Sequence, residues 1–106
     1  MDGLKFKLEK ENFLHGIPKS CASCVFALAV SSATKKRVLV KGNAKVLEEK
    51  GGAVQTYPTY NIKPFWKALE LIEKYDKLRG LRQADFEQAA LSLYEEYKDS
   101  EFHLEK

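Results

Sequence analysis

The nearly apolar run of residues 21–30 constrains the fold of this chain more than any other feature. Its apolar residues are not confined to one stripe, so a helix made from them has to be buried on nearly all sides. Pro18 is tolerated in a first helical turn, and Ser20 is an alternative N-terminal cap. The sequence therefore predicts a central, buried helix that starts at about residue 18 or 21 and ends at Thr34.

Composition indicates an ordinary globular protein. The chain has 106 residues, of which 44% are hydrophobic and 31% charged, which suits a single domain with its own core. The apolar run is too short to span a bilayer, and no signal sequence is recognised at the start of the chain. We therefore expect no membrane contact and a cytoplasmic location, where cysteines are normally reduced.

Strands are predicted on both sides of the central helix. Residues 4–9 alternate apolar and charged side chains, and residues 37–41 form a short apolar run between charges. Gly51 and Gly52 favour a tight hairpin between strands at 45–49 and 53–57, although residues 44–50 alone could also form a helix. Pro58 is expected to end the second of these strands, because proline cannot donate to a sheet ladder.

Two further helices are predicted near the C-terminus. The first starts at Pro64 and stops at Gly80, and an Asp85 and Gln88 capping box opens the second. Their apolar stripes are expected to be Phe65, Leu69, Ile72 and Tyr75 in the first helix, and Phe86, Ala90, Leu93 and Tyr97 in the second.

The order of these elements predicts an α+β fold, in which a small, mainly antiparallel β-sheet packs with the buried central helix and two C-terminal helices. We expect one domain over residues 1–106. It divides into an α+β core at 1–80, an additional helix at 81–98, and a charged tail at 99–106 that frays.

Cys21 and Cys24 form a pair of thiols three residues apart at the start of the apolar run. A thiol pair at a helix N-terminus is typical of redox sites, whereas a zinc site would need further ligands such as His15. Buried free cysteine is also an ordinary core residue, and a spacing of three places both sulfurs on one helix face. We interpret the pair as structural, with a redox site and a zinc site as alternatives.

Two segments are candidates for ligand binding. The basic segment at 35–45 contains five cations and no acid, which would attract phosphate or an acidic surface. The aromatic segment at 56–67 is expected to be a loop leading to a helix start, where aromatic and cationic side chains can hold a base or a peptide. Trp66 is expected to be its most exposed aromatic residue. The candidate binding residues are Lys35, Lys36, Arg37, Lys41 and Lys45 in the first segment, and Tyr57, Tyr60, Lys63, Trp66 and Lys67 in the second.

Four short motifs resemble a set of small uncharacterised bacteriophage proteins. They are residues 12–16 (Asn-Phe-Leu-His-Gly), 24–30 (Cys-Val-Phe-Ala-Leu-Ala-Val), 38–40 (Val-Leu-Val) and 71–76 (Leu-Ile-Glu-Lys-Tyr-Asp). Val25 stands where that set has proline, and Gly80 comes two residues late after Asp76. The resemblance covers about residues 4–80 and implies a phage origin, with no activity or cofactor attached.

Function is expected to be binding, because no catalytic constellation or phosphate loop is recognised. Small phage-borne domains of this kind often block a host protein, so the main hypothesis is a non-enzymatic counter-defence inhibitor without a cofactor. The alternatives are a nucleotide or nucleic-acid binder that uses the two candidate segments, and the cysteine site. A homodimer that forms through the apolar stripe of the last helix is a further alternative.

Overall fold

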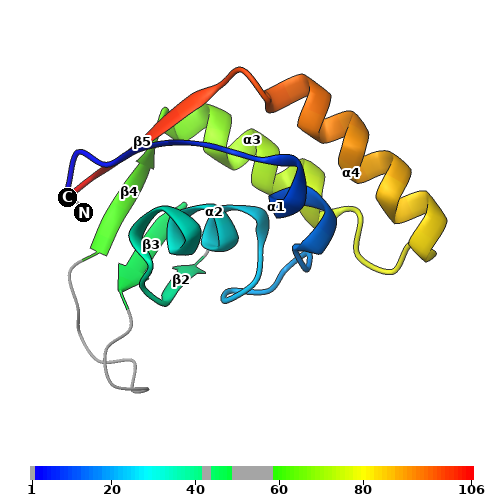
Figure 1. The fold of residues 1–106 in the computed structure, drawn as a ribbon, viewed down its shortest axis with the longest axis horizontal. Coiled ribbons are helices and arrows are strands. Elements are labelled where there is room, and N and C mark those ends of the chain that lie inside the picture. Colours follow the sequence, from blue (N-terminus) through cyan, green and yellow to red (C-terminus); the bar gives the residue numbers. More distant parts are fainter. Residues whose placement is uncertain (1, 42–43, 49–58) are drawn as a thin grey trace.

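The computed structural model describes residues 2–41, 44–48 and 59–106, and these form an α+β fold with a five-stranded antiparallel sheet (Figure 1). The predicted fold class is therefore confirmed. In chain order the elements are β1 (Lys5–Lys7), α1 (Lys10–His15), α2 (Val25–Thr34), β2 (Val38–Lys41), β3 (Lys45–Glu48), β4 (Thr59–Lys63), α3 (Phe65–Asp76), α4 (Gln83–Tyr97) and β5 (Glu101–Glu105).

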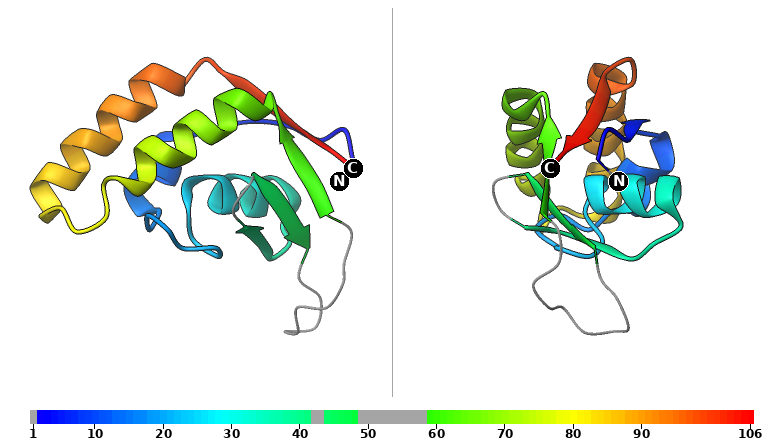
Figure 2. Two further views of the ribbon diagram at one scale, coloured as in Figure 1. Left: turned by 180° about the vertical axis from the view of Figure 1, so that it is seen from behind. Right: turned by 90° about the vertical axis from the view of Figure 1, so that its left-hand side faces the viewer.

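The strands follow the order β1-β5-β4-β3-β2, and every neighbouring pair is antiparallel. The sheet curls so strongly that α2 contacts both of its edge strands, β1 and β2 (Figure 2). The concave face is thus filled by α2, and the convex face points away from it. Among the described helices, none is long and apolar enough to cross a membrane.

The core forms where α2 meets the sheet. Phe26 of α2 is fully buried, and its ring lies 5.1 Å from that of Phe102 in β5. Phe6 of β1 stacks on Phe102 at 6.0 Å and meets Phe26 edge-on at 6.3 Å. Such aromatic pairs stabilise a core beyond the area that they bury. The prediction of a buried central helix is confirmed.

The start of α2 was predicted too early. The helix begins at Val25, and the preceding residues form turns. The Ser20 hydroxyl accepts a hydrogen bond from the Ser23 amide at 3.2 Å, so it caps a turn instead of the helix. The Cys21 carbonyl accepts the Val40 amide proton at 2.8 Å, which fixes this segment against β2 and keeps it out of the helix.

The prediction of a frayed, charged tail at 99–106 is wrong. Residues 101–105 form β5, which pairs with β1 on one side and β4 on the other. Phe102 and Leu104 are fully buried on the concave face, and the residues that alternate with them, Glu101, His103 and Glu105, point outward. The sheet is therefore incomplete within residues 1–80, because β5 is the strand that joins β1 to the rest.

The aromatic segment is also not the predicted loop. Its residues 59–63 form β4, in which Tyr60 and Ile62 are buried. Residues 45–48 form β3, so the strand alternative for this region is correct and the helix alternative is wrong. The predicted Gly51 and Gly52 hairpin turn, the strand at 53–57 and its end at Pro58 lie outside the described residues.

Helix α3 begins at Phe65, one residue after the predicted start at Pro64, and ends at Asp76, before the predicted stop at Gly80. Its buried stripe is Ala68, Leu71 and Tyr75, whereas Phe65 is 36% exposed. Of the predicted stripe only Tyr75 is buried, since Leu69 and Ile72 are half-buried at the edge of the core and Phe65 is exposed.

Helix α4 runs beside α3 and covers α1 (Figures 1 and 2). Its Phe86 ring lies 6.2 Å from Tyr75, and its Tyr94 ring lies 5.9 Å from Phe13 of α1. The helix starts at Gln83 and has no side-chain cap, so Asp85 lies inside its first turn and the predicted capping box is absent.

Candidate functional site

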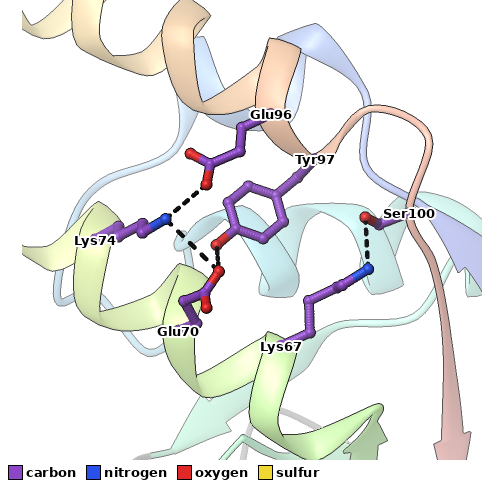
Figure 3. A network of polar contacts seen from close by, with 6 residues as sticks. All are labelled: Lys67, Glu70, Lys74, Glu96, Tyr97 and Ser100. Atoms are coloured by element: carbon purple, nitrogen blue, oxygen red, sulfur yellow. Dashed lines mark hydrogen bonds and ion pairs between the residues drawn. The ribbon is translucent and has the colours of Figure 1, made fainter.

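The most connected polar cluster lies between α3 and α4 (Figure 3). Lys74 Nζ donates to Glu96 Oε1 at 2.6 Å and lies 3.6 Å from Glu70 Oε1, which also accepts a hydrogen bond from the Tyr97 hydroxyl. The Glu96 contact raises the pKa of Lys74, and the Tyr97 hydroxyl lowers the pKa of Glu70. Burial raises the pKa of Tyr97 to about 12. Contacts of Lys74 with Glu96 and of Tyr97 with Glu70 link the two helices.

A pocket of about 160 Å³ opens beside the two cysteines. It lies between the turns before α2, strand β2 and the end of α3, whose Tyr75 and Asp76 form one wall. The Asp76 Oδ1 atom accepts a hydrogen bond from the Lys19 amide at 3.0 Å. This contact holds the cysteine-containing turns against α3.

The two thiols differ in environment. Cys24 is the N-cap of α2, and its Sγ accepts a hydrogen bond from the Ala27 amide at 3.4 Å. Burial raises the pKa of the Cys24 thiol, and the backbone hydrogen bond offsets this only in part. Cys21 is exposed in the preceding turn. Neither sulfur lies inside a helix, so the prediction that both occupy one helix face is wrong.

A raised pKa keeps Cys24 protonated at neutral pH, whereas a reactive helix-capping cysteine has a lowered one. Within the part of the chain that the structure describes, no three His, Cys, Asp or Glu side chains are placed to hold a metal ion. His15 is exposed and does not line the cysteine pocket. The structure therefore does not gather the alternative zinc ligands His15, Cys21 and Cys24.

We expect a thiol reagent at neutral pH to modify Cys21 rapidly and Cys24 only slowly, because Cys24 is partly buried and protonated. The measurement is a time course with a chromogenic disulfide on the native protein, followed by complete reaction in denaturant. Cys21→Ser should remove the fast phase, and the matched variant Cys24→Ser should retain it. Two equally fast thiols would contradict this account of Cys24.

The start of α3 carries an exposed aromatic–lysine surface, made of Lys63, Phe65, Trp66 and Lys67. Trp66 is 65% exposed, which confirms the prediction that it is the most exposed aromatic residue of the segment among those described. Lys63 Nζ lies 5.7 Å from the Phe65 ring, and Lys67 Nζ lies 5.5 Å from the Trp66 ring. Both distances are within the range of a cation–π contact.

Other predicted members of this segment do not join that surface. Tyr60 is only 7% exposed and packs in the core, so it is not available for binding. Tyr57 lies outside the described residues. Lys67 also donates to the Ser100 hydroxyl at 3.2 Å, which ties the start of α3 to the chain entering β5 (Figure 3).

The basic segment at 35–45 is divided by the fold. Lys35 adopts a left-handed conformation at the C-terminal cap of α2, and Lys36 and Arg37 follow it in the connection to β2. Lys41 and Lys45 instead face each other across β2 and β3. Two lysines thus lie on paired strands, and the other three cations lie in the connection before β2.

Strand pairing brings this lysine pair close to residues that sequence reasoning did not connect with it. Lys45 lies opposite Asn61 of β4, and Lys63 of β4 lies opposite His103 of β5. His103 in turn lies opposite Lys5 of β1. The alternating pattern of 4–9 predicted that Lys5 faces outward, but no local signal indicated which strands would be its neighbours.

No protein-family model, curated protein or solved structure matches this chain.

Proposed function

We propose that this chain is a small, non-enzymatic binding protein, encoded by a bacteriophage, that acts in the host cytoplasm on a host protein as a counter-defence inhibitor. The aromatic–lysine surface is its contact site. The observation that supports this proposal is that Trp66 is 65% exposed in the first turn of α3, which a hydrogen bond from Lys67 to Ser100 ties to the chain entering β5. Tryptophan is among the residues most enriched in the centres of protein interfaces.

The surface is preorganised for binding. Pro64 precedes α3, and the Ala68 amide donates to the Pro64 carbonyl at 3.1 Å, so the first turn is regular. The Lys67 contact with Ser100 holds the same turn against the sheet. A rigid aromatic anchor loses little conformational freedom when it enters a partner's pocket, which favours tight binding.

Lysines flank both exposed rings of this surface. A complementary partner would offer an apolar pocket for Trp66 with carboxylates around it, since matched charges raise association rates and exclude wrong partners. The neighbouring Phe65, at 36% exposure, extends the apolar centre. The proposed partner site is therefore an acidic-rimmed apolar pocket on a protein.

Trp66→Ala is expected to weaken binding to the host partner by about thirtyfold or more, the effect of losing a hot-spot side chain. The immobilised protein would capture the partner from host lysate, and the purified partner would then be titrated by calorimetry. Leu81→Ala is the matched control, because Leu81 is a 44% exposed apolar residue in the distant connection between α3 and α4.

Circular dichroism would show that both variants are folded. The proposal fails if the folded wild-type protein captures no partner, or if Trp66→Ala binds the purified partner as tightly as Leu81→Ala does.

A further inference from the structure

The convex side of the sheet carries a lysine-rich outer face. Side chains of paired residues in neighbouring strands point to the same side, and alternate residues of each strand share that side. Phe6, Val40, Val46, Tyr60, Ile62, Phe102 and Leu104 are buried on the concave side, so the residues between them face outward. The outer sheet face therefore includes Lys5 and Lys7 of β1, Lys41 of β2, Lys45 of β3 and Lys63 of β4, with His103 of β5.

These residues form cross-strand rows. One row is Lys5, His103 and Lys63, and another is Lys41, Lys45, Asn61 and Glu105. A third row, with Leu39, Leu47 and Thr59, is uncharged. The two lysine rows together cover all five strands, and because neighbouring strands are about 4.8 Å apart, they extend over about 15–20 Å.

The positive charge of this face is poorly neutralised by the protein itself. Glu101 and Glu105 of β5 are its acids, and Glu105 lies 3.5 Å from the His103 ring. Among the described residues, no ion pair involves any of the five lysines. Lys41 lies directly opposite Lys45, an arrangement of like charges that destabilises a sheet. An anionic ligand would remove this repulsion.

We infer that the outer sheet face binds the phosphate backbone of single-stranded nucleic acid. The spread of the lysines suits a polymer with regularly repeated charges, and lysine contacts phosphate as a point charge. Tyr60, the aromatic side chain of β4, is buried on the other side of the sheet, so the bases are not read and binding is independent of sequence.

The curvature of the sheet favours a single strand over a duplex. The outer sheet face is convex because α2 fills the concave side, as the two views in Figure 2 show. A flexible strand can follow a convex surface and contact lysines from several strands of the sheet. A stiff duplex of the same length would touch only the lysines at the top of the curve.

The test is a titration of a fluorescent oligothymidylate of about twenty nucleotides, followed by anisotropy at several salt concentrations. If all five lysines contact phosphates, the slope of log affinity against log salt should be about −3.5, so that affinity falls roughly a hundredfold between about 50 and 200 mM salt. For a double variant with Lys45→Glu and Lys63→Glu, the slope should drop to about −2 and the affinity at least tenfold.

The matched control is the double variant with Lys77→Glu and Arg79→Glu. It has the same net charge, but both residues lie at the connection between α3 and α4, away from the sheet (Figure 1). It should bind the oligonucleotide at least tenfold more tightly than the sheet variant. Lys45→Glu replaces a like-charge pair with an opposite-charge pair, whereas Lys63→Glu removes a contact with the Phe65 ring. Circular dichroism would show that both double variants are folded.

Three results would overturn the inference. They are an absence of oligonucleotide binding at low salt, equal losses in the sheet variant and the control, and binding of poly-glutamate without binding of the oligonucleotide. The last result would assign the face to an acidic protein segment. Because the outer sheet face is tested here without the host partner, its failure leaves the proposal for Trp66 unaffected.

Discussion

Replacement of Phe102 by alanine is expected to lower the free energy of unfolding by about 3–5 kcal/mol, the usual range for a buried phenylalanine. Phe102 is fully buried and packs against Phe26 and Phe6, so its loss leaves a cavity where the sheet meets α2. A small domain has only about 5–15 kcal/mol of stability, so much of it would be lost. Urea unfolding followed by circular dichroism would measure the change.

His103→Ala is the control for this prediction. His103 follows Phe102 in the same strand but points to the outer face, where it makes one exposed contact with Glu105. Its replacement should change stability by about 0.5 kcal/mol or less. Equal effects of the two replacements would show that β5 does not pack against the core as described.

Gly16→Ala is expected to destabilise the protein by about 2–3 kcal/mol, because the added methyl group has no room. An alanine Cβ at this position would overlap the Tyr75 hydroxyl and lie 2.6 Å from the Asn12 carbonyl oxygen. The backbone at Gly16 has a φ of −69°, which any residue can adopt, so the cost is steric. Urea unfolding again provides the measurement.

A double-mutant cycle with Tyr75→Phe tests the origin of this effect. The Tyr75 hydroxyl donates to the Phe13 carbonyl at 2.9 Å, so its removal alone should cost about 1–3 kcal/mol. In the double variant the overlap with the hydroxyl is gone. Its loss of unfolding free energy should therefore be smaller than the sum of the losses of the two single variants, by at least about 0.5 kcal/mol. Strict additivity would contradict the predicted clash.

Gly80→Ala measures the destabilisation that comes from backbone conformation alone, for comparison with the steric destabilisation of Gly16→Ala. Gly80 has a φ of +87° and nothing within 4 Å of an added Cβ, so the penalty there comes from the left-handed backbone alone. It should be about 1–2 kcal/mol. At Gly16, by contrast, the sequence neighbours give no sign that the Tyr75 hydroxyl approaches the backbone.

Local pattern was sufficient for some elements and insufficient for others. The run at 21–30 predicted the buried helix, since apolar residues on all sides of a helix require burial. The alternation in Glu101-Phe-His-Leu-Glu105 is also a strand signal, but with only two apolar residues it was interpreted as a charged tail. Whether such a segment forms a strand depends on the residues that pack against it. Phe102 is buried because Phe6 and Phe26 surround it.

The candidate binding residues show the same limit. Exposure of Trp66 was predicted from its position beside the apolar stripe of α3, which is a local property. The outer sheet face depends on the strand order, because Lys5 and Lys63 become neighbours of His103 only when β5 enters between β1 and β4. Residue spacing within one strand contains no information about that order.

The position of β5 has a consequence for biosynthesis. The Gly3 amide donates to the Leu104 carbonyl at 2.7 Å, and the Leu104 amide donates to the Leu4 carbonyl at 2.9 Å, so the first and last strands meet across nearly the whole sequence. A nascent chain on the ribosome cannot make these bonds until residues 101–105 have left the exit tunnel. Until then β1 lacks its partner strand, and the ring of Phe26 lacks the residue that covers it. The domain is therefore expected to complete folding only after its last strand emerges, with the slow closure typical of pairing between distant segments.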